Sequence, residues 1–333
     1  MTEAALSPHG AVTYPGWRVE DPVGPWVEVF DSSLVEADAL VFTPWLNVGE
    51  AAPFDGARLQ RASRLKVIAG TFDYRLGWID LDEAARRDVT VVHTSRTMTW
   101  TVAEFGVGIT FALLRDLPAA IDAVRSGDWF DASRTVSTYV FRDLAKCRVG
   151  LAGYGSVNQH YRRFVAPYGC PVSVFDPLVT EEMAAAESVT RVGSLVELAR
   201  SSDIVVAIPP TPSTLGVIDA DVIDALAAGS LFVLLSGMAV VEQDALWRRV
   251  CADEIRAAVD VYEREPPASD AWFRRAANVR PTPHIAGNVP FAHERCLTEA
   301  CADAARVVNA KAPHHAATVR DKRICDGTLE KGS

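Results

Sequence analysis

Cysteine is sparse in this sequence, and its spacing shows neither a C-x-x-C pair nor the ligand spacing of a zinc site. The six cysteines are Cys147, Cys170, Cys251, Cys296, Cys301 and Cys325. We interpret them as buried or incidental thiols, and we expect no metal centre. Unpaired thiols are typical of a reducing compartment, so the predicted location is cytoplasmic.

Positive charge is also in short supply, because 33 Lys and Arg residues stand against 43 Asp and Glu residues, for a formal net charge of −10. This balance argues against partners such as nucleic acid and anionic membranes. Residues 1–20 lack the apolar core of a signal peptide, and we expect no apolar stretch long and charge-free enough to span a bilayer. The composition, 49% hydrophobic and 23% charged, is that of a globular protein with a sizeable core.

Short apolar runs alternate with helical patterns, which predicts an α/β fold with parallel sheets. Strands are predicted at 39–42, 65–69, 89–92, 148–152, 172–175, 204–208, 231–235, 256–260 and 279–282. Helices are predicted at 81–87, 102–115, 156–167, 242–252 and 292–310. Residues 1–27 are expected to form an irregular arm and 313–333 a loose tail. The pattern restarts near residue 148, and we predict one domain of residues 1–117 plus 290–333 and another of 118–289.

A glycine-rich turn lies between the predicted strand at 148–152 and the helix that follows. It reads Gly153, Tyr154, Gly155, Ser156, Val157 and Asn158. Such glycines permit a tight turn and let the backbone approach a pyrophosphate at the helix N-terminus. Asp176, which ends the next predicted strand, is placed to bind the ribose hydroxyls and to repel a 2′-phosphate, so NAD is favoured over NADP. The third glycine of this dinucleotide fingerprint is replaced by Asn158.

Further motifs follow in order from about residue 39 to about residue 310. They include Val102-Ala103-Glu104, Ser202-Asp203-Ile204-Val205, Asp260-Val261-Tyr262, Glu265-Pro266 and Thr282-Pro283-His284-Ile285-Ala286-Gly287. The ordered set resembles the D-isomer-specific 2-hydroxyacid dehydrogenases, the class of phosphoglycerate, D-lactate and formate dehydrogenases. The resemblance implies two Rossmann- or flavodoxin-like domains, an active site in the interdomain cleft, and a homodimer joined through the nucleotide domain.

The resemblance also assigns roles to individual residues. Hydride transfer needs an acid/base for the hydroxyl proton, and imidazole suits that role. His284 matches the acid/base histidine of the family, and Glu265 matches the carboxylate that stabilises its protonated ring. The alternative is a His284 that merely caps a turn and a solvated Glu265. Positions that match the cofactor-lining residues of the family are Pro209, Thr214, Leu235, Ser236, Asp260 and Gly287.

Two departures concern the substrate. The family arginine that holds the substrate carboxylate aligns with Ser236 or Gly237, and no Lys or Arg lies between Ser213 and Trp247. The glycine-rich substrate loop of the family corresponds here to the bulkier stretch 70–78. Within it, Tyr74 and Arg75 are the candidate substrate-binding residues. A surface pair of Arg75 with Asp73 is equally compatible with the sequence, and Arg96 is a second candidate cation.

Three functions are therefore open. The first, which we predict, is an NAD-dependent oxidoreductase that acts on a small, atypical hydroxy or keto substrate. The second is a catalytically silent NAD-binding sensor or partner protein, and the third is a redox-neutral enzyme with tightly bound NAD. The missing arginine and Asn158 favour the second, whereas the intact pair of His284 and Glu265 favours the first.

Overall fold

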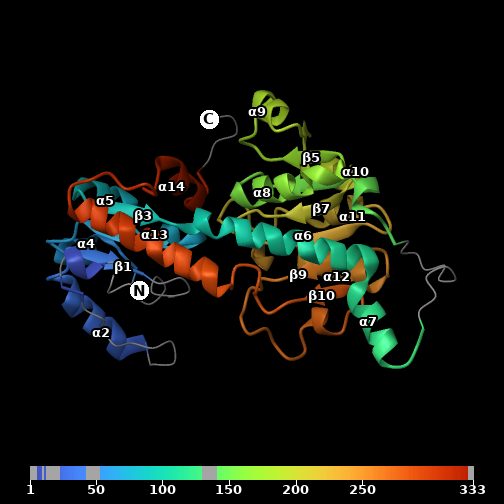
Figure 1. Ribbon diagram of the computed structural model, residues 1–333, viewed down its shortest axis with the longest axis horizontal. Helices are drawn as coiled ribbons and strands as arrows, with labels where there is room; N and C mark the ends of the chain where they lie inside the picture. Colours follow the sequence, from blue (N-terminus) through green and yellow to red (C-terminus); the bar gives the residue numbers. More distant parts are fainter. Residues whose placement is uncertain (1–5, 10, 13–22, 43–52, 130–140, 329–333) are drawn as a thin grey trace. The chain divides into compact units, whose positions relative to one another are not determined.

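The computed structural model describes residues 6–9, 11–12, 23–42, 53–129 and 141–328, without the side chains of 23–26, 73–75 and 204. The chain divides into two compact units. The first unit comprises Met1–Met98 and Val289–Leu329, and the second comprises Thr99–Asn288 and Glu330–Ser333. Both are α/β units, and each is built around its own parallel sheet (Figure 1).

The first unit contains a three-stranded parallel sheet in the order β1-β2-β3. Its strands are β1 (Ala39–Val41), β2 (Val67–Gly70) and β3 (Thr90–His93), and its helices are η1 (Ser7–His9), α2 (Val23–Leu34), α4 (Gly56–Arg61), η2 (Asp73–Trp78), α5 (Leu81–Arg86), η3 (Ser95–Thr97), α13 (Pro290–Val308) and α14 (Val319–Cys325). Alternate residues of β2 face opposite sides of the sheet. Val67 packs with Ala300 and Ala304 of α13, whereas Ile68 packs with the core on the other face.

Two predictions about the ends of the chain were wrong. The arm predicted at 1–27 overlaps α2, which begins at Val23, and most of its remainder lies outside the described residues. The tail predicted at 313–333 folds as far as Cys325. Its residue Ala316 bridges Val92 of β3, and α14 follows. The physical reason is local capping, because the side chains and amides of Thr318 and Asp321 form a capping box that starts a helix without an apolar face.

The second unit contains a seven-stranded parallel sheet in the order β10-β9-β8-β7-β4-β5-β6. Its strands are β4 (Val149–Ala152), β5 (Val172–Phe175), β6 (Thr190–Arg191), β7 (Asp203–Val206), β8 (Leu231–Leu234), β9 (Arg256–Val259) and β10 (Val279–Pro281). Its α-helices are α6 (Thr99–Arg115), α7 (Leu117–Arg125), α8 (Ser156–Val165), α9 (Glu181–Ala186), α10 (Leu195–Ser201), α11 (Ala220–Ala225) and α12 (Gln243–Cys251), and its short 3-10 helices are η4 (Leu144–Lys146), η5 (Ala166–Tyr168), η6 (Met238–Val240) and η7 (Trp272–Arg274).

Helices cover both faces of this sheet, as the predicted alternation of strands and helices requires (Figure 1). One buried cluster includes Leu198 of α10 and Leu246 of α12, and the other includes Leu113 of α6 and Tyr161 of α8. The strand order is that of a doubly wound dinucleotide-binding fold, in which β4 and β7 flank the point where the order reverses. The strand predictions are confirmed to within two residues, apart from the two-residue edge strand β6.

Helix α6 accounts for two differences from the sequence predictions. The boundary between the units falls after Met98 rather than after residue 117, because α6 packs against α8, β8 and β9. The segment Ser95–Arg115, with a mean hydropathy of 1.3, is also long and apolar enough to cross a membrane by length and composition alone. The expectation that no such stretch exists was therefore wrong. A helix that packs in a protein core passes the same test, and Ala103 and Leu113 of α6 are buried.

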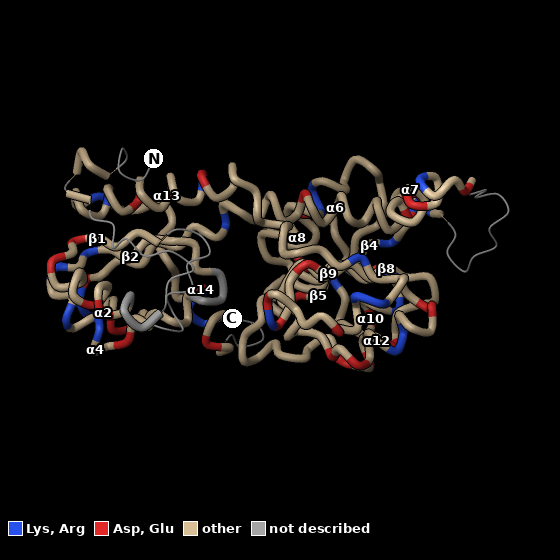
Figure 2. Tube along the Cα trace, turned by 90° about the horizontal axis from the view of Figure 1, so that it is seen from below, with Lys and Arg blue, Asp and Glu red and all other residues tan. Residues whose placement is uncertain are grey.

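Charged residues of both signs are interspersed over the described part of each unit (Figure 2). Helix α6 has few charged residues, because Glu104 is the one charged residue before Arg115 at its end.

Candidate functional site

The predicted cofactor-binding positions of the second unit all lie just beyond the carboxyl ends of its strands. The strands pair in parallel, so these ends share one edge of the sheet. Gly153–Val157 follow β4 and Asp176 follows β5, while later positions follow β7 to β10, namely Pro209, Thr214, Leu235, Ser236, Asp260, His284 and Gly287. Open α/β sheets bind ligands at this edge. The fold therefore brings the cofactor positions to the place where a nucleotide is expected.

The glycine-rich turn has the geometry that a dinucleotide requires. Gly153 has a φ of +78°, and an added Cβ would lie 2.9 Å from the carbonyl oxygen of Ala207, so a larger residue does not fit. An added Cβ on Gly155 would meet nothing within 4 Å. Gly155 is also the N-cap of α8, so the cap contributes no side-chain acceptor to the first-turn amides. Open space and helix amides at this turn match what a pyrophosphate needs.

Asp176 is tied to this turn through its carboxylate. The backbone N–H of Tyr154 donates to Oδ2 at 2.8 Å, and the backbone N–H of Leu178 donates to Oδ1 at 2.8 Å. Each carboxylate oxygen has a second lone pair, so Asp176 retains the capacity to accept ribose hydroxyls. Leu178 was not identified from the sequence, because its contribution comes from the backbone.

Asn158, in place of the third glycine, is fully buried. Its Nδ2 donates to the carbonyl oxygens of Gly153 at 2.7 Å, Ala152 at 3.2 Å and Val205 at 3.4 Å. The amide therefore links α8 to the end of β4 and to β7. A glycine at this position allows close packing of helix and strand, whereas here hydrogen bonds connect the same elements.

His284 and Glu265 form the polar pair that the motifs predict. Nδ1 of His284 donates to Oε2 of Glu265 at 2.7 Å, and the two side chains are 28% and 36% exposed. The backbone N–H of Tyr262 donates to Oε1 of Glu265 at 3.0 Å, which fixes the other carboxylate oxygen. The imidazole is thus held with a hydrogen on Nδ1, and its accessible position suits proton exchange.

Asp260 holds the backbone of the loop that carries His284. It is 1% exposed, and it accepts hydrogen bonds from Thr282 Oγ1 at 2.6 Å, Ile285 N at 2.9 Å and Ala286 N at 2.8 Å. His284 has a φ of +52°, a left-handed conformation that is uncommon for a residue with a side chain. The buried carboxylate therefore stabilises a turn that would otherwise be strained.

Tyr262, three residues beyond the end of β9, supports the same loop. Its hydroxyl donates to the carbonyl oxygen of Thr282 at 2.9 Å. Burial, with the nearby charge of Asp260, raises the pKa of Tyr262 to about 12, so the phenol stays protonated and remains a donor. The sequence motifs include Tyr262 and Thr282, but their roles depend on contacts that appear only in the folded chain.

The loop after β8 carries no cationic side chain. The N–H of Leu235 continues the ladder by donating to Val206 O at 2.9 Å, and Ser236 and Gly237 follow. A Cβ added to Gly237 would lie 3.2 Å from Cγ of Pro210, so this position is closely packed. In the first unit, Tyr74 and Arg75 belong to η2, but their side chains lie outside the described residues.

Comparison with known proteins identifies relatives of this chain. The sequence profile of the D-isomer specific 2-hydroxyacid dehydrogenase, NAD binding domain, matches residues 107–286. D-3-phosphoglycerate dehydrogenase of Mycobacterium tuberculosis is 29% identical over 277 residues, which are 83% of this chain and 50% of that protein. Human glyoxylate reductase/hydroxypyruvate reductase is 31% identical over 225 residues, 67% of this chain and 68% of that protein.

The fold has relatives among solved structures as well. The holo form of Rhodotorula graminis D-mandelate dehydrogenase superposes with a TM-score of 0.80 at 22% identity, over 95% of this chain and 93% of that one. The chain spans about half the length of the phosphoglycerate dehydrogenases that it matches. The matched domain and the geometry of the glycine-rich turn agree that the cofactor is NAD. The chain belongs to the D-isomer specific 2-hydroxyacid dehydrogenase family.

Proposed function

We propose that this protein is an NAD-dependent oxidoreductase that interconverts a hydroxy and a keto group on a small molecule, with His284 as the acid/base. The observation that carries the proposal is the 2.7 Å hydrogen bond between Nδ1 of His284 and Oε2 of Glu265. Both residues lie beyond the carboxyl end of the sheet, on the same edge as the glycine-rich turn. An acid/base pair at the cofactor-binding edge is what hydride transfer to or from a carbonyl carbon requires.

The residues of the chain have separate tasks in this reaction. NAD, when bound, supplies the carbon that accepts or donates hydride. Nε2 of His284 gives a proton to the carbonyl oxygen during reduction and takes it from the hydroxyl during oxidation. Glu265 holds the ring orientation and stabilises the imidazolium. Asp260 contributes by holding the loop, since each of its oxygens already accepts a hydrogen bond from that loop.

The remaining cofactor contacts are also part of the proposal. The backbone at Ser156 and Val157 receives the pyrophosphate, and Asp176 receives the adenosine ribose. Thr214 donates to the carbonyl oxygen of Pro209 at 2.5 Å, which shapes the loop after β7 along the nucleotide. Leu235, Ser236 and Gly287 line the nicotinamide end with their backbone.

The substrate is expected to be atypical for the family. An arginine fork holds a carboxylate by two parallel hydrogen bonds, and the loop after β8 offers no cation for this purpose, because Ser213–Trp247 lacks Lys and Arg. We assign the compensating contacts to Arg75 and Tyr74 of η2. The second candidate cation, Arg96, lies 3.6 Å from Asp321 in the first unit.

The absence of a cation at Ser236 and Gly237 also favours a second candidate function, a catalytically silent protein that binds NAD as a sensor or partner. A redox-neutral enzyme with tightly held NAD is the third. The retained contact between His284 and Glu265 supports the oxidoreductase over the silent protein.

We further propose a cytoplasmic homodimer joined through the second unit. Helix α7 has no buried residue and presents Leu117, Ile121 and Val124 on one face, with exposures of 45%, 48% and 58%. An exposed apolar face on a helix is typical of an interaction surface. The cysteines of the described residues are all free, which fits a reducing compartment.

A screen of hydroxy and keto compounds, with and without carboxylates, tests the proposed function through the absorbance of NADH. Turnover of a keto compound is the expected result, and a neutral compound that reacts as well as its carboxylate analogue would establish the atypical substrate. Protein that binds NADH and turns over no compound supports the silent candidate. Purification with NAD already bound, again without net oxidation, supports the redox-neutral one.

A further inference from the structure

The C-terminal segment of the described chain, residues 314–325, folds back on the sheet of the first unit. After α13 the chain reverses at Ala310, which has a φ of +55°. The N–H of His93 donates to the carbonyl oxygen of His315 at 2.8 Å, and that of Ala317 donates to Val91 O at 2.7 Å. Residues 315–317 thus form a short antiparallel addition to the edge strand β3.

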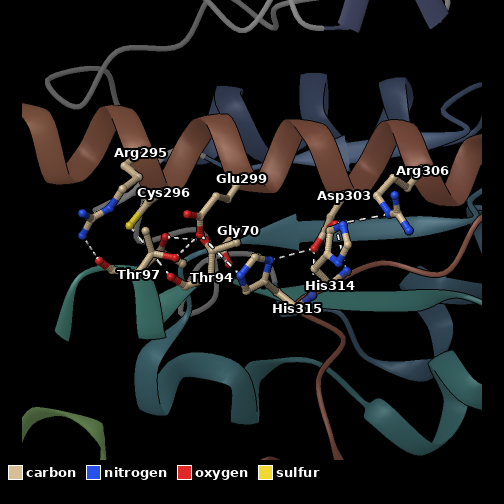
Figure 3. Close-up of polar contacts among 11 residues, drawn as sticks. Gly70, Thr94, Thr97, Arg295, Cys296, Glu299, Asp303, Arg306, His314 and His315 are labelled. Atoms are coloured by element: carbon tan, nitrogen blue, oxygen red, sulfur yellow. Dashed lines mark hydrogen bonds and ion pairs between the residues drawn. The ribbon is translucent and has the colours of Figure 1, made fainter. Parts of the chain in front are cut away.

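Asp303 of α13 holds the start of this C-terminal segment through hydrogen bonds. The side chain is 1% exposed, and it accepts the backbone N–H of His314 at 2.9 Å and that of His315 at 2.8 Å, as well as Nδ1 of His315 at 2.9 Å (Figure 3). Nε2 of His315 lies 3.4 Å from Oε2 of Glu299, one turn earlier on α13. A buried carboxylate with three donors is a strong anchor, because charge-assisted hydrogen bonds in low dielectric are stronger than neutral ones.

Helix α14 follows the anchored segment in the chain and contacts η2. The two helices pack together, and an added Cβ on Gly77 would lie 3.7 Å from Cβ of Cys325. Asp321 lies 3.6 Å from Arg96, and Nζ of Lys322 lies 3.4 Å from Asp82, so two ion pairs connect α14 to other elements of the unit. A helix of seven residues is marginal in isolation, so α14 depends on these contacts and on the anchored segment before it.

The 3-10 helix η2 has no side-chain cap at its start. Its N-cap, Phe72, makes no side-chain capping hydrogen bond, and 3-10 hydrogen bonds are weaker than those of an α-helix. The segment follows the carboxyl end of β2, the edge where parallel sheets bind ligands. It also carries Tyr74 and Arg75, the candidate substrate-binding residues of the proposed function.

We infer that the C-terminal segment is the element that positions η2 for the substrate, and that Asp303 is the positioning residue that locks it. This inference rests on the proposed function for its catalytic consequence. The physical link from Asp303 through His315 and α14 to η2 is independent of that function.

The test compares the full chain with its Asp303→Asn variant by amide hydrogen exchange and by kinetics. Exchange of the amides at 71–80 is expected to accelerate about tenfold or more, because loss of the anchor frees α14 and then η2. KM for a compound that the wild type turns over is expected to rise about fivefold, with kcat and the Kd for NADH within twofold. Asp224→Asn is the control, since Asp224 pairs with Arg248 at 3.0 Å within the second unit, whereas η2 belongs to the first.

Unchanged exchange at 71–80, in a variant whose residues 314–325 exchange faster, would overturn the inference. If Asp303→Asn does not fold, Asp321→Ala replaces it, because that change removes the capping box and the contact with Arg96 without altering a buried residue. The same acceleration at 71–80 is expected, and its absence counts against the inference. If the wild type turns over no compound, the proposed function fails, and the exchange measurement still decides the positioning role.

Discussion

Oδ2 of Asp176 accepts the backbone N–H of Tyr154 at 2.8 Å, so the acid at the end of β5 is fastened to the middle of the glycine-rich turn. The two elements that we propose to contact the ribose and the pyrophosphate of the cofactor are therefore linked by a hydrogen bond. Their relative position does not have to be set by the ligand, which lowers the entropic cost of binding.

Cofactor preference is predicted to depend on this carboxylate. The wild type should bind NADH more tightly than NADPH, because a 2′-phosphate would approach a negative charge. Asp176→Ser should weaken NADH binding about tenfold and bring the affinities for NADH and NADPH closer together. Fluorescence titration with both nucleotides measures the effect, and thermal unfolding of the variant serves as the control for lost hydrogen bonds. Equal affinity of the wild type for both nucleotides contradicts the assignment.

Asn158 is predicted to be a stabilising residue that glycine cannot replace. Asn158→Gly restores the family fingerprint but leaves the carbonyls of Ala152, Gly153 and Val205 without their shared donor. The expected loss is about 1–3 kcal/mol in the free energy of unfolding by urea. Asn158→Asp should be worse, since it places a carboxylate against three carbonyl oxygens. A glycine variant as stable as the wild type would show that these bonds contribute nothing.

The stability of the first unit is predicted to depend on pH through Asp303. Burial alone would raise the pKa of this carboxyl, but the hydrogen bonds from His314 and His315 outweigh it and lower the pKa below its usual 3.8. The stabilisation is therefore complete above the unfolded-state pKa and is lost as pH falls through the lower folded-state value. Asp303→Asn should lower the free energy of unfolding by about 1–3 kcal/mol at pH 7. The difference in this free energy between wild type and variant should shrink below about pH 4. Urea unfolding of both proteins at pH 7 and below about pH 4 checks this prediction. A stability difference that does not change with pH would contradict it.

The exposed face of α7 is predicted to be a subunit contact. Ile121→Asp should convert a dimer to a monomer in light scattering after gel filtration, because it places a charge in an apolar interface. Asp122→Ala is the control, since the Asp122 side chain is 77% exposed and lies one residue from that face. A wild type that is monomeric, or an Ile121→Asp variant that remains dimeric, rules out this interface.

The strands and the glycine-rich turn could be predicted because their causes are local. A run such as Leu231–Leu234 is apolar throughout, as a strand covered on both faces must be, and Gly153 marks a positive φ. The pairing of His284 with Glu265 was expected from motif order alone. These features depend on residue type at short range, or on a resemblance that spans the chain.

The contacts of Asp260 and Asp303 could not be predicted, since most of their partners are backbone amides placed by the fold. An acidic residue at a buried position of a helix, as Asp303 is in α13, was the available signal for a polar anchor. Helix α14 was missed because it has no apolar periodicity, although Thr318 and Asp321 have the spacing of a capping box. Helix α6 was assigned to the wrong unit because its packing partner α8 is distant in sequence.

The central claim is that His284 exchanges the proton that accompanies hydride transfer. The most direct measurement is turnover of NADH with an active keto compound by His284→Ala, alongside the Kd for NADH and the control variant His9→Ala, whose histidine is exposed in the first unit. The account predicts that His284→Ala lowers kcat about 10²- to 10⁴-fold with NADH binding intact, while His9→Ala is unaffected. A His284→Ala variant that turns over within threefold of the wild type would contradict it.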